Sequence, residues 1–207
     1  AVFVCCIAFT YFVSTLSKLP HGAYWSLILA AIPLIVMLVW TQGQKRMFLA
    51  LRPLDFQTFL ISYEQIYAKG RNIAGTALYF CRGYQMISPY IVHSIFRSNI
   101  IYERNILISI NRTDEPYGVR VNFKKDLGPG LESFEVMAGY REVLDIEGLI
   151  KQHEIHEKVI FYGVEDIVTR NPIWRIFSLI KRITPNFVQF SKLPPSRLQG
   201  IVTRVEM

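Results

Sequence analysis

The chain has 207 residues, 51% of them hydrophobic, and a formal net charge of +7 at pH 7. Three cysteines are too few for a disulfide scaffold, so we do not expect a disulfide-stapled fold. The excess of basic residues is modest and the sequence contains no aromatic–basic recognition motif, so we do not expect nucleic-acid binding. Residues 1–44 contain one fully charged side chain, Lys18, while the rest of the charge follows, which excludes a single uniform globule.

The first predicted element is an apolar helix over residues 1–16, which contain no charged side chain. Crossing the hydrocarbon core of a bilayer takes about 20 helical residues, so this run is slightly short. The run also starts without an initiator Met or a basic leader segment. We therefore interpret it as the remainder of a membrane span in a longer chain whose beginning lies upstream.

A second apolar run covers residues 23–40 and is nearly long enough to span a membrane alone. Tyr24 and Trp25 at one end and Trp40 at the other are typical of the two lipid–water interfaces. Pro33 lies inside the run, and membrane helices tolerate such a residue when neighbouring helices satisfy the backbone. A buried helical hairpin in a soluble protein is the alternative, disfavoured because core helices seldom stay uncharged for so long.

Basic residues indicate the orientation of the second run. The connection over residues 17–22 contains one lysine, whereas Lys45, Arg46 and Arg52 follow the run. The more basic side is expected in the cytoplasm, which places the downstream domain there and the connection outside. Neither run contains an ionisable side chain that would mark an ion or proton path, and His21 as an external proton sensor is disfavoured.

The water-facing part is predicted to begin with a linker over residues 41–55 and an amphipathic helix over 56–69. One α/β domain follows. Its helices are expected over residues 89–97, 145–153 and from Pro172 onward, where Asn171 is the N-cap. Its strands are expected over residues 76–81, 105–110, 117–123, 133–140, 158–162, 166–169 and 199–206. The predicted divisions are thus 1–41 for two membrane helices (about 1–16 and 20–40), 42–70 for linker and helix, and 71–207 for the domain.

The last predicted helix is basic and amphipathic. Residues 170–192 include five basic side chains and no acidic one. The predicted apolar face consists of Ile173, Trp174, Phe177, Ile180 and Ile183, with Arg175, Ser178 and Arg182 opposite. Such a helix suits an anionic lipid surface, but we favour docking on its own sheet with a solvated basic face.

Residues 153–157 (HEIHE) invite a metal-site interpretation, because His153 and His156 are three residues apart. A structural zinc site needs four ligands, so a solvated polar turn is favoured. Cys81 is expected to be a buried strand residue. No nucleophile-elbow, P-loop or Rossmann fingerprint occurs, and we predict no enzyme activity, cofactor or metal.

Four segments carry a recognisable pattern: residues 19–30 (LPHGAYWSLILA), 71–80 (RNIAGTALYF), 99–116 (NIIYERNILISINRTDEP) and 193–207 (LPPSRLQGIVTRVEM). Together they resemble the KUP/HAK/KT family of potassium-uptake transporters. Their order and spacing agree across almost the whole chain. Ala23, Ser26, Ala74 and Asn111 depart from the family pattern and affect only local turn or helix-entry geometry.

The resemblance implies a mixed fold: the last two transmembrane helices of a LeuT-like α-helical transporter, followed by a cytosolic α/β domain. It implies potassium uptake with proton symport by alternating access, in a multi-pass protein of the cell membrane. The family's ion-binding residues lie in earlier helices, so none is assigned here. The alternative is a membrane-anchored cytosolic sensor that transports nothing.

The domain itself is expected to be either regulatory or structural. A regulatory domain would bind a soluble effector such as a nucleotide, and Arg97, Arg104 and Arg112 are the candidate residues because the domain carries surplus basic charge. A structural domain would support folding and form a homodimer.

Overall fold

The computed structural model describes residues 2–17, 22, 24–81, 83, 85–184 and 193–207. The chain divides into two compact units, Ala1–Lys45 and Arg46–Met207. The predicted connection over residues 17–22, with Lys18 and His21, lies mostly outside the described residues.

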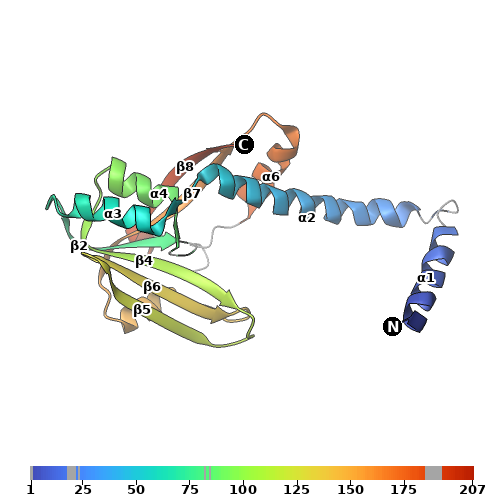
Figure 1. Cartoon of the computed structure of the whole chain (residues 1–207), viewed down its shortest axis with the longest axis horizontal. Coiled ribbons are helices and arrows are strands. Elements are labelled where there is room, and N and C mark those ends of the chain that lie inside the picture. The colour runs from blue at the N-terminus through green and yellow to red at the C-terminus, as the bar shows by residue number, and fades with distance from the viewer. Residues whose placement is uncertain (1, 18–21, 23, 82, 84, 185–192) are drawn as a thin grey trace. The chain divides into compact units, whose positions relative to one another are not determined.

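Two apolar helices, α1 (Val2–Ser17) and α2 (Tyr24–Leu51), account for most of the first unit (Figure 1). By length and composition α2 is the one helix among the described residues that could cross a membrane, and the apolar stretch Phe3–Thr15 of α1 is shorter. Pro33 lies inside α2, where its missing N–H removes one helical hydrogen bond.

The linker predicted over residues 41–55 is wrong for most of its length, because α2 continues as helix to Leu51. The side chain of Met47 in this stretch is fully buried. Tertiary contact thus keeps a rather polar segment helical, and the helix ends where Pro53 disfavours helical backbone in the residue before it. That residue, Arg52, has the left-handed φ of 46°.

A six-stranded sheet organises the second unit, with strand order β5-β6-β4-β2-β7-β8. The strands are β2 (Ile73–Cys81), β4 (Tyr102–Thr113), β5 (Val119–Gly128), β6 (Leu131–Gly139), β7 (Glu157–Val168) and β8 (Leu198–Glu206). All neighbours pair in parallel except β5 and β6, which form an antiparallel hairpin with a turn at residues 128–131. Short strands β1 (Leu54–Asp55) and β3 (Met86–Ile87) pair separately.

Helices cover both faces of this sheet. On one face lie α3 (Phe56–Tyr67) and α4 (Pro89–Val92), as Figure 1 shows, followed by the π-helical turn His93–Arg97. These elements pack over buried residues such as Tyr79 and Phe161. On the other face α5 (Ile146–Gln152) packs over Ile106 and Phe134. Because α3 contributes buried Phe59 and Tyr63, the helix predicted to accompany a linker is part of the domain core.

The strands predicted separately over residues 158–162 and 166–169 form one strand, β7. Gly163 lies in the middle of it, in the gap between the two predicted strands. A Cβ atom built there would lie 2.7 Å from Cδ1 of Tyr90. The glycine therefore permits close packing of an aromatic ring on the strand and does not end it.

Asn105 anchors a buried polar network at the start of β4. Its Oδ1 accepts from the Tyr102 backbone N–H at 3.1 Å, and its Nδ2 donates to the Tyr102 carbonyl at 2.7 Å and to the Tyr63 hydroxyl at 2.9 Å. The Tyr63 hydroxyl is 3.3 Å from the carbonyl of Gly130, in the β5–β6 turn. One fully buried amide therefore joins α3, β4 and that turn.

We expect Asn105→Ala to lower the free energy of unfolding by about 2 to 3 kcal/mol, because it removes the Asn105 partner of the Tyr102 backbone groups and the hydrogen bond that the Tyr63 hydroxyl accepts. Urea unfolding of the detergent-solubilised chain, followed by tryptophan fluorescence, measures the loss. Asn122→Ala, in half-exposed β5, is the matched control and should change little. Equal effects of the two substitutions would contradict this role for Asn105.

Candidate functional site

The sheet changes direction between β2 and β7. From β2 the chain proceeds to β4 and β6 on one side, and after α5 it returns to β7 and β8 on the other. Open α/β sheets bind ligands beyond the carboxyl ends of the strands at such a switch point. In this sheet the switch point lies beyond Tyr79 and Phe161, the last register pair of β2 and β7.

The side chain of Tyr90 occupies this place. It is buried, its ring lies on Gly163, and its hydroxyl is hydrogen-bonded to the carbonyl of Phe80 and 3.3 Å from that of Phe161. Burial holds the pKa of this hydroxyl well above its usual value, so it stays a neutral donor. A ligand at the switch point would have to displace the ring.

Cys81 is a buried thiol at the carboxyl end of β2. Its Sγ lies 3.4 Å from the Ile108 carbonyl, and burial raises the pKa of its thiol to about 12. The thiol is therefore protonated at neutral pH, and nucleophilic chemistry needs the thiolate. Cys81 is thus a buried strand residue, as the sequence predicts.

A second polar cluster joins the end of α2 to α6 (Pro172–Ile183), the helix between β7 and β8. Lys181 Nζ lies 2.9 Å from Glu165 Oε2 of β7 and 2.9 Å from Met47 Sδ. Both partners of the ion pair are mostly buried, with side chains 15% and 21% exposed. Pairing offsets the cost of removing the two charges from water.

The guanidinium of Arg46 lies over the ring of Trp174, 4.7 Å from its centroid, which is a cation–π contact. Two contacts thus connect the last turns of α2 to α6: Arg46 of α2 with Trp174, and Met47 of α2 with Lys181. The prediction missed this cluster because residues 41–55 were interpreted as a linker. The helical spacing of Met47 and Leu51 was the available signal.

Asn171 caps α6 as predicted, its side chain accepting from the Ile173 backbone N–H at 2.9 Å. The predicted apolar face is only partly right. Trp174 and Phe177 are buried, whereas Ile173 and Ile183 are exposed. The buried stripe instead runs through Trp174, Phe177 and Lys181, because the ion pair with Glu165 draws the lysine inward.

The three arginines proposed for an effector lie apart. Arg104 makes a two-pronged ion pair with Glu132, at 2.9 and 2.8 Å. Arg112 donates to the carbonyls of Gly139 and Glu142 at 2.8 and 2.9 Å. Eight residues of strand, a rise of about 27 Å, separate these two. Arg97 is exposed, and within the described part of the chain it has no recorded partner.

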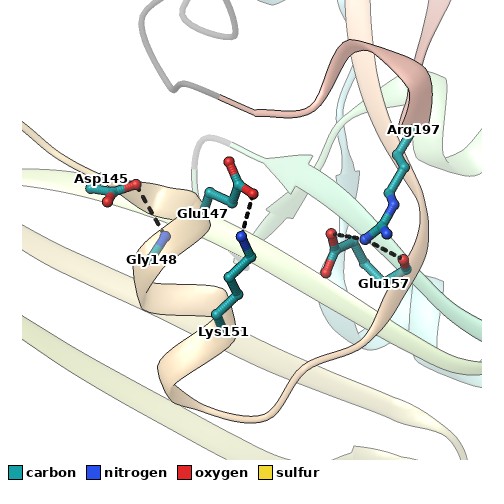
Figure 2. A network of polar contacts seen from close by, with 6 residues as sticks. All are labelled: Asp145, Glu147, Gly148, Lys151, Glu157 and Arg197. Atoms are coloured by element: carbon teal, nitrogen blue, oxygen red, sulfur yellow. Dashed lines mark hydrogen bonds and ion pairs between the residues drawn. The ribbon is translucent and has the colours of Figure 1, made fainter.

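Figure 2 shows the polar contacts around α5 and the start of β8. Arg197 of the Leu-Pro-Pro-x-Arg segment lies 2.6 Å from Glu157 Oε1 and 3.3 Å from the Glu157 carbonyl oxygen. Because Glu157 begins β7 and Arg197 directly precedes β8, the pair fixes the starts of neighbouring strands. Asp145 caps α5 by accepting from the Gly148 N–H at 3.0 Å.

His153 and His156, which invited a metal-site interpretation, lie in different environments. His153 packs edge-on against Phe134, with ring centroids 5.1 Å apart, and its Nδ1 lies 2.9 Å from the Leu149 carbonyl. His156 is exposed, and Glu157 is paired with Arg197. Over the described residues, no group of three or more His, Cys, Asp or Glu side chains could hold a metal ion.

Comparison with known proteins identifies the family of the chain, which the geometry alone does not. The family model described as "K+ potassium transporter C-terminal domain" matches residues 74–207, and "K+ potassium transporter integral membrane domain" matches residues 1–45. No solved structure matches the chain.

Curated relatives match over the entire chain. The chain is 62% identical to "Probable potassium transport system protein Kup" of Geotalea uraniireducens and to "Kup 2" of Geobacter metallireducens. It is 45% identical to the Kup protein of Methanosarcina acetivorans. Each alignment covers 100% of this chain and 34% of the relative, so the chain spans about a third of the length of these relatives. With an apolar pair of helices matching the membrane model and the α/β unit matching the C-terminal model, the chain belongs to the K+ potassium transporter family.

Proposed function

We propose that this chain is part of a potassium uptake transporter, a K+/H+ symporter of LeuT-like fold that works by alternating access. The observation that carries the proposal is the order of the two family matches, membrane domain first and C-terminal domain second. The names of the curated relatives support potassium as the transported ion. The ion path is proposed to lie in helices outside this chain, since α1 and α2 carry no ionisable side chain in their apolar parts apart from the cysteine thiols and tyrosine hydroxyls.

In this proposal α1 and α2 both cross the cell membrane and the α/β unit is cytoplasmic. The support is the exposure of the aliphatic side chains along α2, such as Leu29 and Met37, which leaves them to be covered by lipid or other helices. Lys45, Arg46 and Arg52 at the end of α2 favour the cytoplasmic side for that end.

Rubidium uptake tests the transport proposal. Cells deficient in potassium uptake, expressing the full reading frame that contains this segment, should accumulate rubidium, and faster at acidic than at neutral external pH because protons drive the symport. The same frame with residues 46–207 deleted is the comparison for the role of the α/β unit. Absence of uptake at either pH, with the protein present in the membrane, would favour the membrane-anchored sensor.

A reporter fused after Met207 tests the orientation. Alkaline phosphatase folds only outside the cytoplasm, so we expect its fusion to be inactive and a green fluorescent protein fusion to be bright. The reversed pattern would place the α/β unit outside and contradict the proposal, whatever the outcome of the uptake assay.

The α/β unit is proposed to be regulatory, through a soluble anionic effector, or structural, through a homodimer. Exposed Arg97 supports the first role better than Arg104 and Arg112, which are held by their own chain. Edge strand β8 supports the second, because it pairs with β7 on one side and edge strands can pair with another chain.

Calorimetry and light scattering on one detergent-solubilised sample distinguish the two roles. An effector role predicts heat with a nucleotide at high-micromolar concentration and loss of that heat in Arg97→Ala, with exposed Arg120→Ala as the control. A structural role predicts the mass of two chains and no heat. A monomer without heat would exclude both.

A further inference from the structure

Helix α6 has a second apolar face that its own domain leaves uncovered. Ile173, Ile176, Leu179 and Ile183 are 51%, 50%, 59% and 74% exposed, while Trp174 and Phe177 on the buried side are 6% and 0% exposed. The four exposed residues recur at intervals of three and four, so they share one side of the helix. We refer to these four side chains as the outer face of α6. A docked helix normally turns charged residues to this side.

Cations flank the outer face. Arg175 and Arg182 are both exposed and seven residues apart, which puts them on one flank, two turns from each other. Residues 170–184 contain no carboxylate. The nearest acidic group recorded for these arginines is Asp166, whose Oδ1 lies 3.9 Å from Arg182 Nη2 in an exposed and therefore weak pair. Lys181 is turned to the opposite side, toward Glu165.

Helix α6 contacts residues of α2 that follow the apolar run by only a few positions in the sequence. Arg46 lies over Trp174, and Met47 contacts Lys181. Trp40 ends the apolar run, and six residues of helix, a rise of about 9 Å, separate it from Arg46. The polar headgroup layer on each side of a bilayer is roughly 5 to 7 Å thick. If residues 23–40 span the membrane along its normal, Arg46 lies at most about 4 Å beyond the headgroup layer, so a helix in contact with Arg46 can reach the headgroups.

We propose that the outer face of α6 lies in the headgroup region of the anionic cytoplasmic leaflet. Ile176, Leu179 and Ile183 would enter the boundary with the acyl chains, and Arg175 and Arg182 would bind lipid phosphates, as in other interfacial amphipathic helices. This inference rests on the proposed membrane span of α2.

A second copy of the chain fits this face less well than lipid does. A symmetric contact would bring the outer faces of two α6 helices together, with the flanking arginines of both chains close to each other and no carboxylate between them within residues 170–184. Protein interfaces also rely on aromatic anchors, and this face contains only aliphatic side chains. The flanking arginines and the purely aliphatic face both suit a fluid, negatively charged lipid surface.

The experiment places a fluorescent label on the outer face in the full chain. Cys5→Ala and Cys6→Ala remove the exposed thiols, and Cys81 stays because its buried, protonated thiol reacts slowly. Ile176→Cys then carries an environment-sensitive maleimide dye in nanodiscs of phosphatidylcholine with or without phosphatidylglycerol.

Two other label positions serve as controls. Ile61→Cys carries the dye on α3, at an isoleucine that is 62% exposed and thus comparable with Ile176, and it should stay in water. Ile35→Cys carries it in the apolar part of α2, where a lipid-borne nitroxide should quench it if α2 spans the disc.

In anionic discs the dye at residue 176 should be quenched by the nitroxide and protected from aqueous iodide. Each arginine near an anionic surface changes surface partitioning about fivefold, so Arg175→Glu with Arg182→Glu should lower the ratio of docked to undocked α6 at least about 25-fold. Arg120→Glu, an exposed arginine on edge strand β5, should leave the ratio unchanged.

Three results would overturn the inference in different ways. Iodide access at residue 176 with lipid quenching at residue 35 would refute membrane docking of α6 and leave the α2 span intact. Protection from both quenchers would show that protein, such as a second copy, covers the face. Absence of lipid quenching at residue 35 would refute the span itself and the inference with it.

Discussion

Burial of a parallel sheet on both faces is the constraint on which the second unit depends. Parallel strands need crossover connections, and these bring helices to both sides of the sheet. Here β2 contributes Tyr79 to the core under α3 and α4, and its neighbour Leu78 to the core next to α5. The crossover from β7 to β8 is α6, and its position follows from the same rule. Its Trp174 and Phe177 are buried, whereas Ile173, Ile176, Leu179 and Ile183 are exposed.

The change from an apolar to a polar chain takes place within α2. A helix can cross this boundary without leaving backbone groups unpaired, because its hydrogen bonds are internal. Beyond Trp40 the helix becomes polar, and it is held by Arg46 on Trp174 and by Met47 at Lys181. The ion pair of Lys181 with Glu165 lets a cation lie at this mostly buried position. The same few contacts therefore fix the end of α2 and the orientation of α6.

Several residues in the family-like segments are structural in this fold. Arg197 pairs with Glu157 where β7 and β8 begin, and Asn105 satisfies backbone groups where β4 begins. Gly75 has a φ of +112°, a conformation that side chains rarely adopt, and a Cβ there would lie 3.2 Å from Cδ of Lys158. These positions hold strand starts in register. Tyr90 fills the switch point, the place where other open α/β sheets bind small molecules.

Local sequence pattern was sufficient to predict the apolar and polar division of the chain, most strand and helix positions, the Asn171 cap and the family. These depend on local periodicity, capping chemistry and motif order, which are properties of neighbouring residues. Three features could not be predicted in this way: residues 41–51 are helical, Gly163 lies inside one strand, and one particular side of α6 is buried. Each of these depends on a distant partner: the burial of Met47, the ring of Tyr90 and the carboxylate of Glu165. Local pattern could not reveal them, because the contact that decides each conformation joins residues that are far apart in the sequence.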